Sequence, residues 1–134
     1  MAYWLIKSDP ETYSIDDFQK EGKTDWDGVR NYQARNNLAK MVVGDRALFY
    51  HSNIGKSIMG IAEITKESFA DLTSNDPRWL AVEVKFISKF AKPVSLETIK
   101  NTPKLKEIAL IRQSRLSVMP LTEEEYNEIL ELGK

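Results

Sequence analysis

The sequence predicts an α+β domain in which five or six mostly antiparallel strands curl into a partial barrel flanked by short helices. Segments rich in Val, Ile and Phe dominate the second half of the chain, and short helical patterns flank them. No internal repeat, low-complexity tract or Pro/Gly-rich linker divides the sequence. The 134 residues, 42% of them hydrophobic, suffice for one ordinary core. We therefore expect a single domain over residues 1–134.

The chain begins with a predicted strand followed by a short helix. Residues 3–7 are mostly apolar, which is typical of a central strand. Ser14 and Asp17 have the spacing of an N-terminal capping box, and Gly22 is placed to end the helix that follows. We expect this helix over residues 15–21.

A second helix is predicted over residues 29–41, where apolar side chains recur at helical spacing. Asn31 and Arg35 then lie one turn apart on one face, so both can point at the same ligand.

The second half predicts mainly strands, joined first by a hairpin loop over residues 53–56. Pro120 is expected to halt the last strand, and Thr122 with Glu125 forms a capping box for a C-terminal helix that reaches Leu132. The expected strands cover residues 46–52, 57–65, 80–90 and 115–119.

Composition limits the function. The chain has no cysteine, which excludes thiol catalysis, thiolate metal sites and disulfides. The formal net charge of -1 does not fit a general coater of DNA, so any contact with nucleic acid must be local. No segment approaches the length of a membrane span, and no basic segment precedes the apolar N-terminus. We expect a soluble cytoplasmic protein with no membrane contact, cofactor or metal.

Two patterns resemble catalytic motifs but lack their context. Gly55-Lys56-Ser57 matches the end of a phosphate-binding loop, yet Tyr50 stands where that loop needs its first glycine. His51 is the only histidine, so a histidine-rich metal site is impossible and no nucleophile with a base and an orienting group can be assembled. The sequence therefore predicts a protein that is not an enzyme.

The segment Trp26-Asp27-Gly28-Val29-Arg30-Asn31-Tyr32-Gln33-Ala34-Arg35-Asn36 concentrates side chains that stack and hydrogen-bond. Trp offers a flat apolar surface, Asn donates and accepts in one plane, and Arg provides a rigid fork of donors. Together these groups suit a nucleobase and its phosphate backbone.

Five blocks of sequence, in order from residue 3 to residue 118, are similar to those of the EVE domain family. Asp9 is a small departure, because the family is expected to favour Glu there. The blocks are YWLIKSDP from residue 3, WDGVRNYQARN from residue 26, GD at residue 44 leading to FYHS at residue 49, DPRW from residue 76 and RQSRLSV from residue 112.

This resemblance implies a PUA-like pseudobarrel related to YTH domains and SRA-type readers of modified bases. It also implies non-catalytic binding of a modified nucleobase in DNA or RNA, flipped into an aromatic pocket. Trp26 is the expected first wall, not wholly enclosed by the core, and Trp79 the second. Asn31 is expected to contact the base or to orient the loop that carries Trp26, and Arg30, Arg35 and Arg115 are expected to contact backbone phosphate. The candidate ligand-binding residues are Lys7, Ser8, Trp26, Asn31, Tyr32, Arg35, Tyr50, His51, Ser52, Trp79 and Arg115.

Plainer structural roles remain open for these residues. Trp26 and Trp79 can be barrel core, and residues 50–52 can form a satisfied buried network. Arg115 can be a charge at a sheet edge, or can pair with Asp25 or Asp27. The alternative function is a binding protein or enzyme for a free nucleoside-like or carboxylated metabolite, which the near-neutral charge favours because a free ligand needs no track for phosphates.

Overall fold

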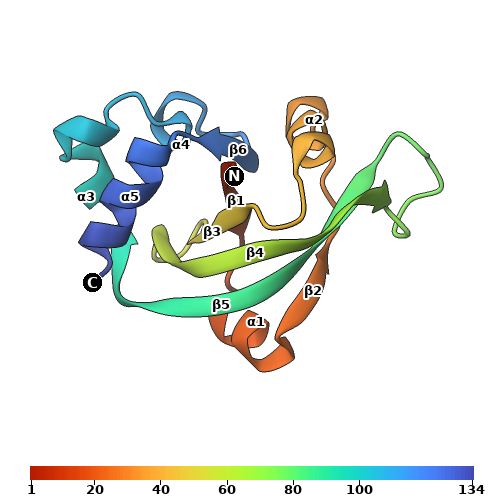
Figure 1. Cartoon of the computed structure of the whole chain (residues 1–134), viewed down its shortest axis with the longest axis horizontal. Coiled ribbons are helices and arrows are strands. Elements are labelled where there is room, and N and C mark those ends of the chain that lie inside the picture. Colours follow the sequence, from red (N-terminus) through yellow and green to blue (C-terminus); the bar gives the residue numbers. More distant parts are fainter.

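The computed structural model describes residues 1–134, and its strands form one curved, six-stranded sheet (Figure 1). In order of pairing the strands are β2, β5, β4, β3, β1 and β6. Strands β1 and β3 are parallel, and the remaining pairings are antiparallel. This confirms the predicted α+β class. The strands are β1 (Tyr3–Ser8), β2 (Lys23–Trp26), β3 (Arg46–His51), β4 (Ser57–Ala70), β5 (Leu80–Ser95) and β6 (Val118–Leu121).

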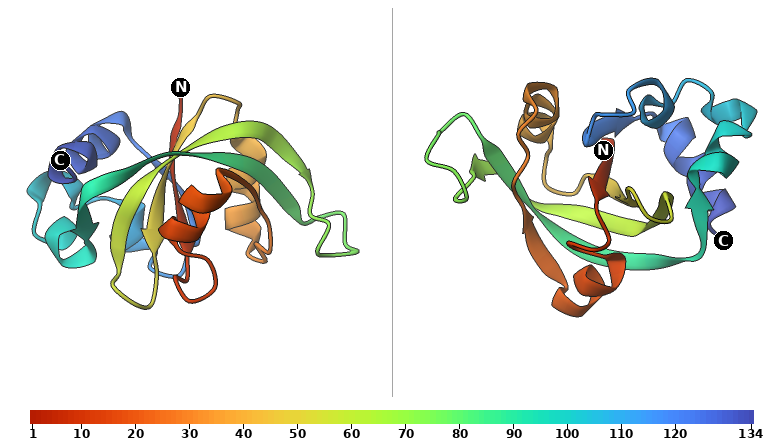
Figure 2. Two further views of the ribbon diagram at one scale, coloured as in Figure 1. Left: turned by 90° about the horizontal axis from the view of Figure 1, so that it is seen from below. Right: turned by 180° about the vertical axis from the view of Figure 1, so that it is seen from behind.

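Short helices cover the sheet in two places. Helices α3, α4 and α5 gather at one end of the molecule, whereas α1 and α2 lie on opposite sides of the long β4–β5 pair (Figures 1 and 2). None of the helices has the length and apolar character that spanning a membrane requires. The helices are α1 (Ile15–Glu21), α2 (Tyr32–Lys40), α3 (Leu96–Lys100), α4 (Ala109–Arg112) and α5 (Glu123–Leu132), with a 3₁₀ turn over Pro103–Leu105.

The sheet curls because β4 and β5 shift register repeatedly along their length. Such irregularities add local twist and bend. At Gly60 the two strands approach so closely that a Cβ atom would lie 2.4 Å from the backbone oxygen of Ser88. The curled sheet does not close, since its edge strands β2 and β6 pair with no strand on their outer sides. An open seam therefore remains between the two edges.

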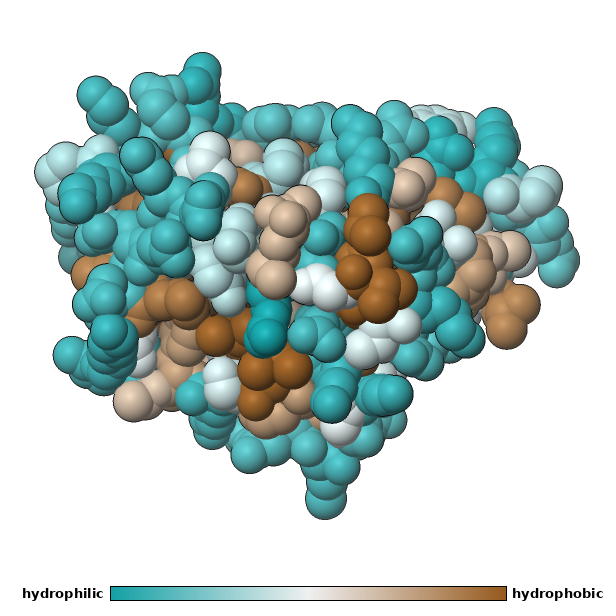
Figure 3. Space-filling view, viewed as in Figure 1, coloured by the Kyte–Doolittle hydropathy of each residue, from teal (hydrophilic) through white to brown (hydrophobic).

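Aromatic packing fills the concave side near this seam. The ring of Phe18 on α1 stacks on that of Phe49 on β3, with 5.4 Å between centroids. Trp26, at the end of β2, meets Phe49 edge-on at 5.5 Å. The core thus continues to the seam. Over one face of the molecule, hydrophilic side chains surround separate apolar patches (Figure 3).

Elements with strong local signals form as predicted. Ser14 and Thr122 each make a complete capping box, and residues 53–56 form the hairpin loop, with positive φ at Asn53, Gly55 and Lys56. Strands β4 and β5 are longer than predicted, because they continue to Ala70 and Ser95 instead of ending at residues 65 and 90.

Three expectations about the elements were wrong. Strand β2 was not expected, because only one of its four residues is buried. Helix α2 begins at Tyr32 rather than at residue 29, since Asn31 is its N-cap. The last strand is Val118–Leu121 rather than 115–119, and it includes Pro120, which an edge strand tolerates because one side of its backbone needs no partner.

Asp45 anchors the N-terminal strand from a buried position. It is 4% exposed and accepts hydrogen bonds at 3.0 Å from the backbone N–H groups of Ala2 and Val42 and from the indole N–H of Trp4. These donors come from segments about forty residues apart in the chain, so the carboxylate joins β1 to the turn before β3.

We expect Asp45→Ala to lower the free energy of unfolding by about 3 kcal/mol, because it leaves buried donors without an acceptor. Chemical denaturation of the purified variant measures this. Asp16→Ala is the control, since Asp16 is exposed and makes only a surface ion pair with Lys89. Equal stability of the two variants would contradict the anchoring role.

Candidate functional site

A cavity of about 480 Å³ occupies the open seam of the sheet. Its walls come from the end of β1, the loop that leads to α1, strand β2 with the segment that follows it, and the residue before β6. The cavity therefore lies where the barrel fails to close. The lining residues are Lys7, Ser8, Asp9, Thr12, Tyr13, Thr24, Asp25, Trp26, Asp27, Gly28, Val29, Arg30, Asn31 and Ser117.

Trp26 belongs both to this cavity and to the core. Its side chain is 8% exposed, and its ring makes edge contacts with Tyr13 at 6.3 Å and with Phe49 at 5.5 Å. We expected that the core would not wholly enclose Trp26. The core in fact covers most of this residue, and only a small part of it lines the cavity. Truncating this residue would remove core packing worth about 3–5 kcal/mol as well as a cavity wall.

Lys7 and Ser8 line the cavity, as expected, from the last two positions of β1. Lys7 Nζ donates to the backbone oxygen of Ser114 at 2.8 Å, and burial lowers the pKa of its ammonium group. The hydroxyl of Ser8 donates to the backbone oxygen of Tyr13 at 2.6 Å, which holds the loop before α1 against the strand.

Asn31 also lines the cavity, but as the N-cap of α2 rather than as an interior helix residue. Its side-chain oxygen accepts from the backbone N–H of Ala34 at 2.9 Å. No other residue accepts from its side-chain N–H₂ group, so that donor is free for a ligand. Asn31 and Arg35 lie one helical turn apart, as expected, but only Asn31 lines the cavity.

Ten lining residues were not among the predicted ligand-binding set. Asp27, Gly28, Val29 and Arg30 lay within the segment singled out above, so its polar density was the available signal. Thr24 and Asp25 belong to the unpredicted strand β2. Asp9 and Ser117 lay in two of the sequence blocks that resemble the family, so those blocks were the available signal, whereas Thr12 and Tyr13 lie in the loop before α1 and had none.

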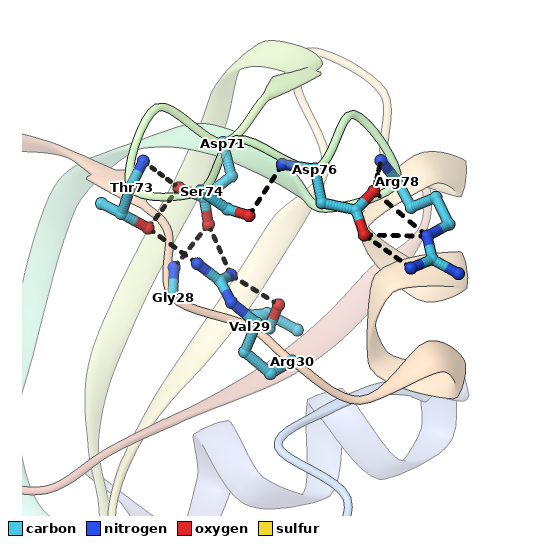
Figure 4. Close-up of polar contacts among 8 residues, drawn as sticks. All are labelled: Gly28, Val29, Arg30, Asp71, Thr73, Ser74, Asp76 and Arg78. Atoms are coloured by element: carbon cyan, nitrogen blue, oxygen red, sulfur yellow. Dashed lines mark hydrogen bonds and ion pairs between the residues drawn. The ribbon is translucent and has the colours of Figure 1, made fainter.

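Asp71 fixes the segment that follows β2 (Figure 4). It is 2% exposed and accepts from the backbone N–H of Gly28 at 2.8 Å and from Arg30 Nη1 at 2.9 Å. Thr73 donates to it through both its N–H and its hydroxyl. Burial by itself raises the pKa of Asp71, but the hydrogen bonds from Thr73, Arg30 and Gly28 outweigh it and hold that pKa well below 3.8. The loop between β4 and β5 and the cavity wall therefore share one carboxylate.

A cluster of aromatic rings and guanidinium groups lies beside the cavity. Tyr32, which is 52% exposed, stacks on Trp79 with 5.1 Å between ring centroids. The guanidinium carbons of Arg35 and Arg78 lie 5.8 and 5.9 Å from the centre of the Tyr32 ring, and that of Arg30 lies 5.6 Å from the Trp79 ring. We call these five residues the stacked cluster.

The stacked cluster contains three of the predicted ligand-binding residues, Tyr32, Arg35 and Trp79, but none of the three lines the cavity. Trp79 was expected to form the second wall, but it does not line the cavity, because the β4–β5 loop brings its ring onto Tyr32. Tyr32 and Arg35 likewise lie outside the cavity, on the adjacent surface. The acidic partners of Arg30 and Arg78 are Asp71 and Asp76, whereas Arg35 has no carboxylate partner.

Residues 50–52 do not reach the cavity. Tyr50 is 3% exposed and lies beneath Lys7, and the backbone N–H of Ser52 donates to Ser8 at 2.9 Å. His51 Nε2 accepts from the backbone N–H of Ile15 at 2.9 Å, at the start of α1. Burial lowers the pKa of His51, which favours the neutral ring that can accept this bond. Tyr50 is buried, His51 and Ser52 are half-buried, and both of the latter bond to neighbouring backbone, so the structure favours an internal network for these residues.

Arg115 lies in a second, shallower depression of about 360 Å³ that adjoins the cavity at Asn31. Its side chain pairs with no carboxylate, so neither Asp25 nor Asp27 is its partner. Gln33 donates to Gln113 across this depression at 2.8 Å, which links α2 to the end of α4.

The charges are arranged unevenly across the site. Three carboxylates, Asp9, Asp25 and Asp27, and two cations, Lys7 and Arg30, line the cavity. Further arginines lie outside it, in the stacked cluster and in the second depression. No group of His, Cys, Asp or Glu is arranged to hold a metal ion.

We expect Asp71→Asn to lower the free energy of unfolding at neutral pH by about 1.5–3 kcal/mol, since it weakens hydrogen bonds to a buried charge. Because the folded pKa lies below the ordinary 3.8, this stabilisation is present above that pH and is lost as pH falls through the folded pKa. The difference between the thermal melts of the two proteins should therefore shrink as the pH falls from 5 to 2. Asp76→Asn, on the same loop but more exposed, should show a smaller difference; a constant gap at every pH would contradict the assignment.

Comparison with known proteins identifies the family to which this chain belongs. The model of the EVE domain matches residues 2–132. Thymocyte nuclear protein 1 of Mus musculus is 38% identical over 164 residues, which cover 97% of this chain and 73% of that protein.

Solved structures agree with this match. A protein from Agrobacterium tumefaciens is 43% identical with a TM-score of 0.97, over 99% of this chain and 93% of that one. Human THYN1 protein, solved in complex with 5-methylcytosine containing DNA, is 34% identical with a TM-score of 0.94, over 100% of this chain and 98% of that one. The chain belongs to the EVE domain family.

Proposed function

We propose that this protein is a non-catalytic reader of a modified nucleobase in nucleic acid, with DNA as the favoured carrier and the base bound in the seam cavity. The observation that carries the proposal is this aromatic-walled cavity of about 480 Å³ in a chain similar to THYN1, which has been solved with 5-methylcytosine containing DNA. The volume lies within the range of ligand pockets. A base inside a duplex must be flipped out to enter such a pocket.

The geometry argues against catalysis. Ser8, Thr12 and Ser117 supply hydroxyl groups to the cavity, but none of them hydrogen-bonds to a carboxylate or to a histidine. The only histidine, His51, accepts at Nε2 from the backbone N–H of Ile15 at the start of α1. An activated hydroxyl nucleophile needs an adjacent base. Binding is therefore the function that these residues support.

The stacked cluster extends the proposed interface beyond the cavity. Aromatic faces with nearby guanidinium groups suit nucleotides that flank the bound base. Arg30 belongs to both the cavity wall and the cluster, so a strand whose base enters the cavity passes this surface.

The alternative ligand is a free nucleoside-like molecule, which the mixed charge of the cavity also suits. A carboxylated metabolite is disfavoured, since three carboxylates line the walls. Affinity for an oligonucleotide falls steeply with ionic strength, whereas affinity for a neutral nucleoside does not.

We expect Thr12→Trp to weaken binding of an oligonucleotide containing 5-methylcytosine at least tenfold, because the added ring fills the cavity from an exposed loop position. Fluorescence anisotropy titration measures the dissociation constant. Glu11→Trp is the matched control, as Glu11 is the exposed neighbour that does not line the cavity. If both variants bind like the unaltered protein, the base does not occupy this cavity.

We expect Arg35→Ala to weaken binding of modified and plain oligonucleotides alike and to lower the salt slope by roughly one unit, because one unpaired cation near phosphate is removed. Titrations at several salt concentrations give the slope. Lys100→Ala, which removes an exposed cation from α3 at the other end of the molecule, should leave it unchanged. A change in base preference for Arg35→Ala would contradict a pure phosphate contact.

A further inference from the structure

Two carboxylates in the seam cavity accept no hydrogen bond from another residue of the protein. Asp9, by contrast, is satisfied: its two oxygens accept from the backbone N–H of Glu11 at 2.9 Å and from Asn53 at 2.8 Å. Both Asp25 and Asp27 line the cavity and are exposed. The only protein donor to either side chain is the backbone N–H of Asp27 itself, which bonds to the Asp27 carboxylate. Their acceptor oxygens are therefore free to meet a ligand.

Unpaired carboxylates are unexpected in a site for nucleic acid, because they repel phosphate. They favour binding only where the ligand presents hydrogen-bond donors. Among groups on base edges, the exocyclic amino group of cytosine is a donor that Asp and Glu accept from, whereas thymine presents an oxygen at the same ring position.

We propose that Asp27 is a specificity-determining residue whose carboxylate accepts a hydrogen bond from the exocyclic amino group of the bound base, so that the cavity selects cytosine-type bases over their oxo counterparts. This inference rests on the proposed function, and it names the class of base.

A methyl-binding surface alone cannot make this selection. 5-Methylcytosine and thymine carry the same methyl group on C5, so an apolar wall gains equally from both, about 0.8 kcal/mol for one buried methyl. The two bases differ at C4, where one carries an amino group and the other a carbonyl oxygen, and at N3, which accepts in 5-methylcytosine and donates in thymine. An acceptor placed against the C4 substituent therefore lets a reader of 5-methylcytosine reject thymine, which ordinary DNA contains throughout.

Position distinguishes Asp27 from Asp25. Asp27 lies between Trp26, the aromatic wall, and Gly28, whose N–H is held by Asp71, so its backbone is fixed next to the expected stacking surface. Asp25 precedes Trp26 in β2 and pairs with Glu83 of β5. Burial and the nearby carboxylates of Asp71 and Asp25 raise the pKa of Asp27, and the hydrogen bond from its own backbone N–H only partly offsets this rise.

The test measures binding of the full-length protein to four single-stranded oligonucleotides that differ only in one central base: cytosine, 5-methylcytosine, uracil or thymine. Single strands remove the unequal cost of opening different base pairs. The pairs cytosine/5-methylcytosine and uracil/thymine measure the methyl contribution. The pairs uracil/cytosine and thymine/5-methylcytosine measure the contribution of the amino group.

The unaltered protein should prefer 5-methylcytosine to thymine by roughly 10- to 100-fold, the range of one well-formed base contact. Asp27→Asn should reduce that preference to less than about threefold, because an amide can turn either its oxygen or its N–H₂ group toward the base. Asp27→Ala should lose the preference as well. Asp25→Asn, which removes the same charge from the same wall, should keep it.

Equal affinity of the unaltered protein for 5-methylcytosine and thymine would overturn the inference, as would full selectivity in Asp27→Asn. Loss of selectivity in Asp25→Asn alone would assign the role to Asp25 and overturn it for Asp27. Thermal melts should show all three variants folded, since neither carboxylate bonds to another residue of the protein. Failure of the proposed function is separate: it would appear as no methyl preference in either pair and no effect of Thr12→Trp.

Discussion

The buried carboxylate of Asp71 is the interaction on which the geometry of the site depends. It accepts hydrogen bonds from Gly28, Arg30 and Thr73, and so joins two segments 43 residues apart. A charge removed from water is tolerated only when donors surround it, so the carboxylate and its donors must be placed together. The same bond network that fixes the cavity wall also directs the β4–β5 loop, and with it Trp79, toward Tyr32. The cavity and the stacked cluster are therefore not independent features.

Local sequence signals predicted the helices and turns whose energetics are local. The capping boxes at Ser14 and Thr122 depend on side chains within three residues of the backbone groups they satisfy, and the hairpin loop over residues 53–56 depends on local backbone conformation with positive φ. Strand β2 had no such signal, because it exists through pairing with β5, and that pairing depends on residues about sixty positions away. Asn31 was assigned to the helix interior because periodicity does not separate a cap from the first turn.

The candidate site was predictable to the extent that its residues cluster in sequence. Trp26 and Asn31 lay in one dense polar segment, and Lys7 and Ser8 end the first strand. Tyr50, His51 and Ser52 had the same appearance at another strand end, yet they serve the start of α1 and the pairing of the loops. Polar residues at the end of a strand can therefore either line a ligand site or bond to a neighbouring helix or loop, and the sequence does not distinguish the two. Asp71 carried no signal at all, because its donors are distant in the chain.

Negative and positive charges lie in different parts of the site. Free carboxylates lie inside the cavity, and the unpaired cations Arg35 and Arg115 lie outside it. A phosphate is repelled from the interior and attracted to the surroundings, whereas a base with donors on its edge is favoured inside. Under the proposed function, a nucleotide would enter with its base first and leave its backbone at the surface. The near-neutral net charge of the whole chain is compatible with this proposal, because the two signs would then act at different places on one ligand.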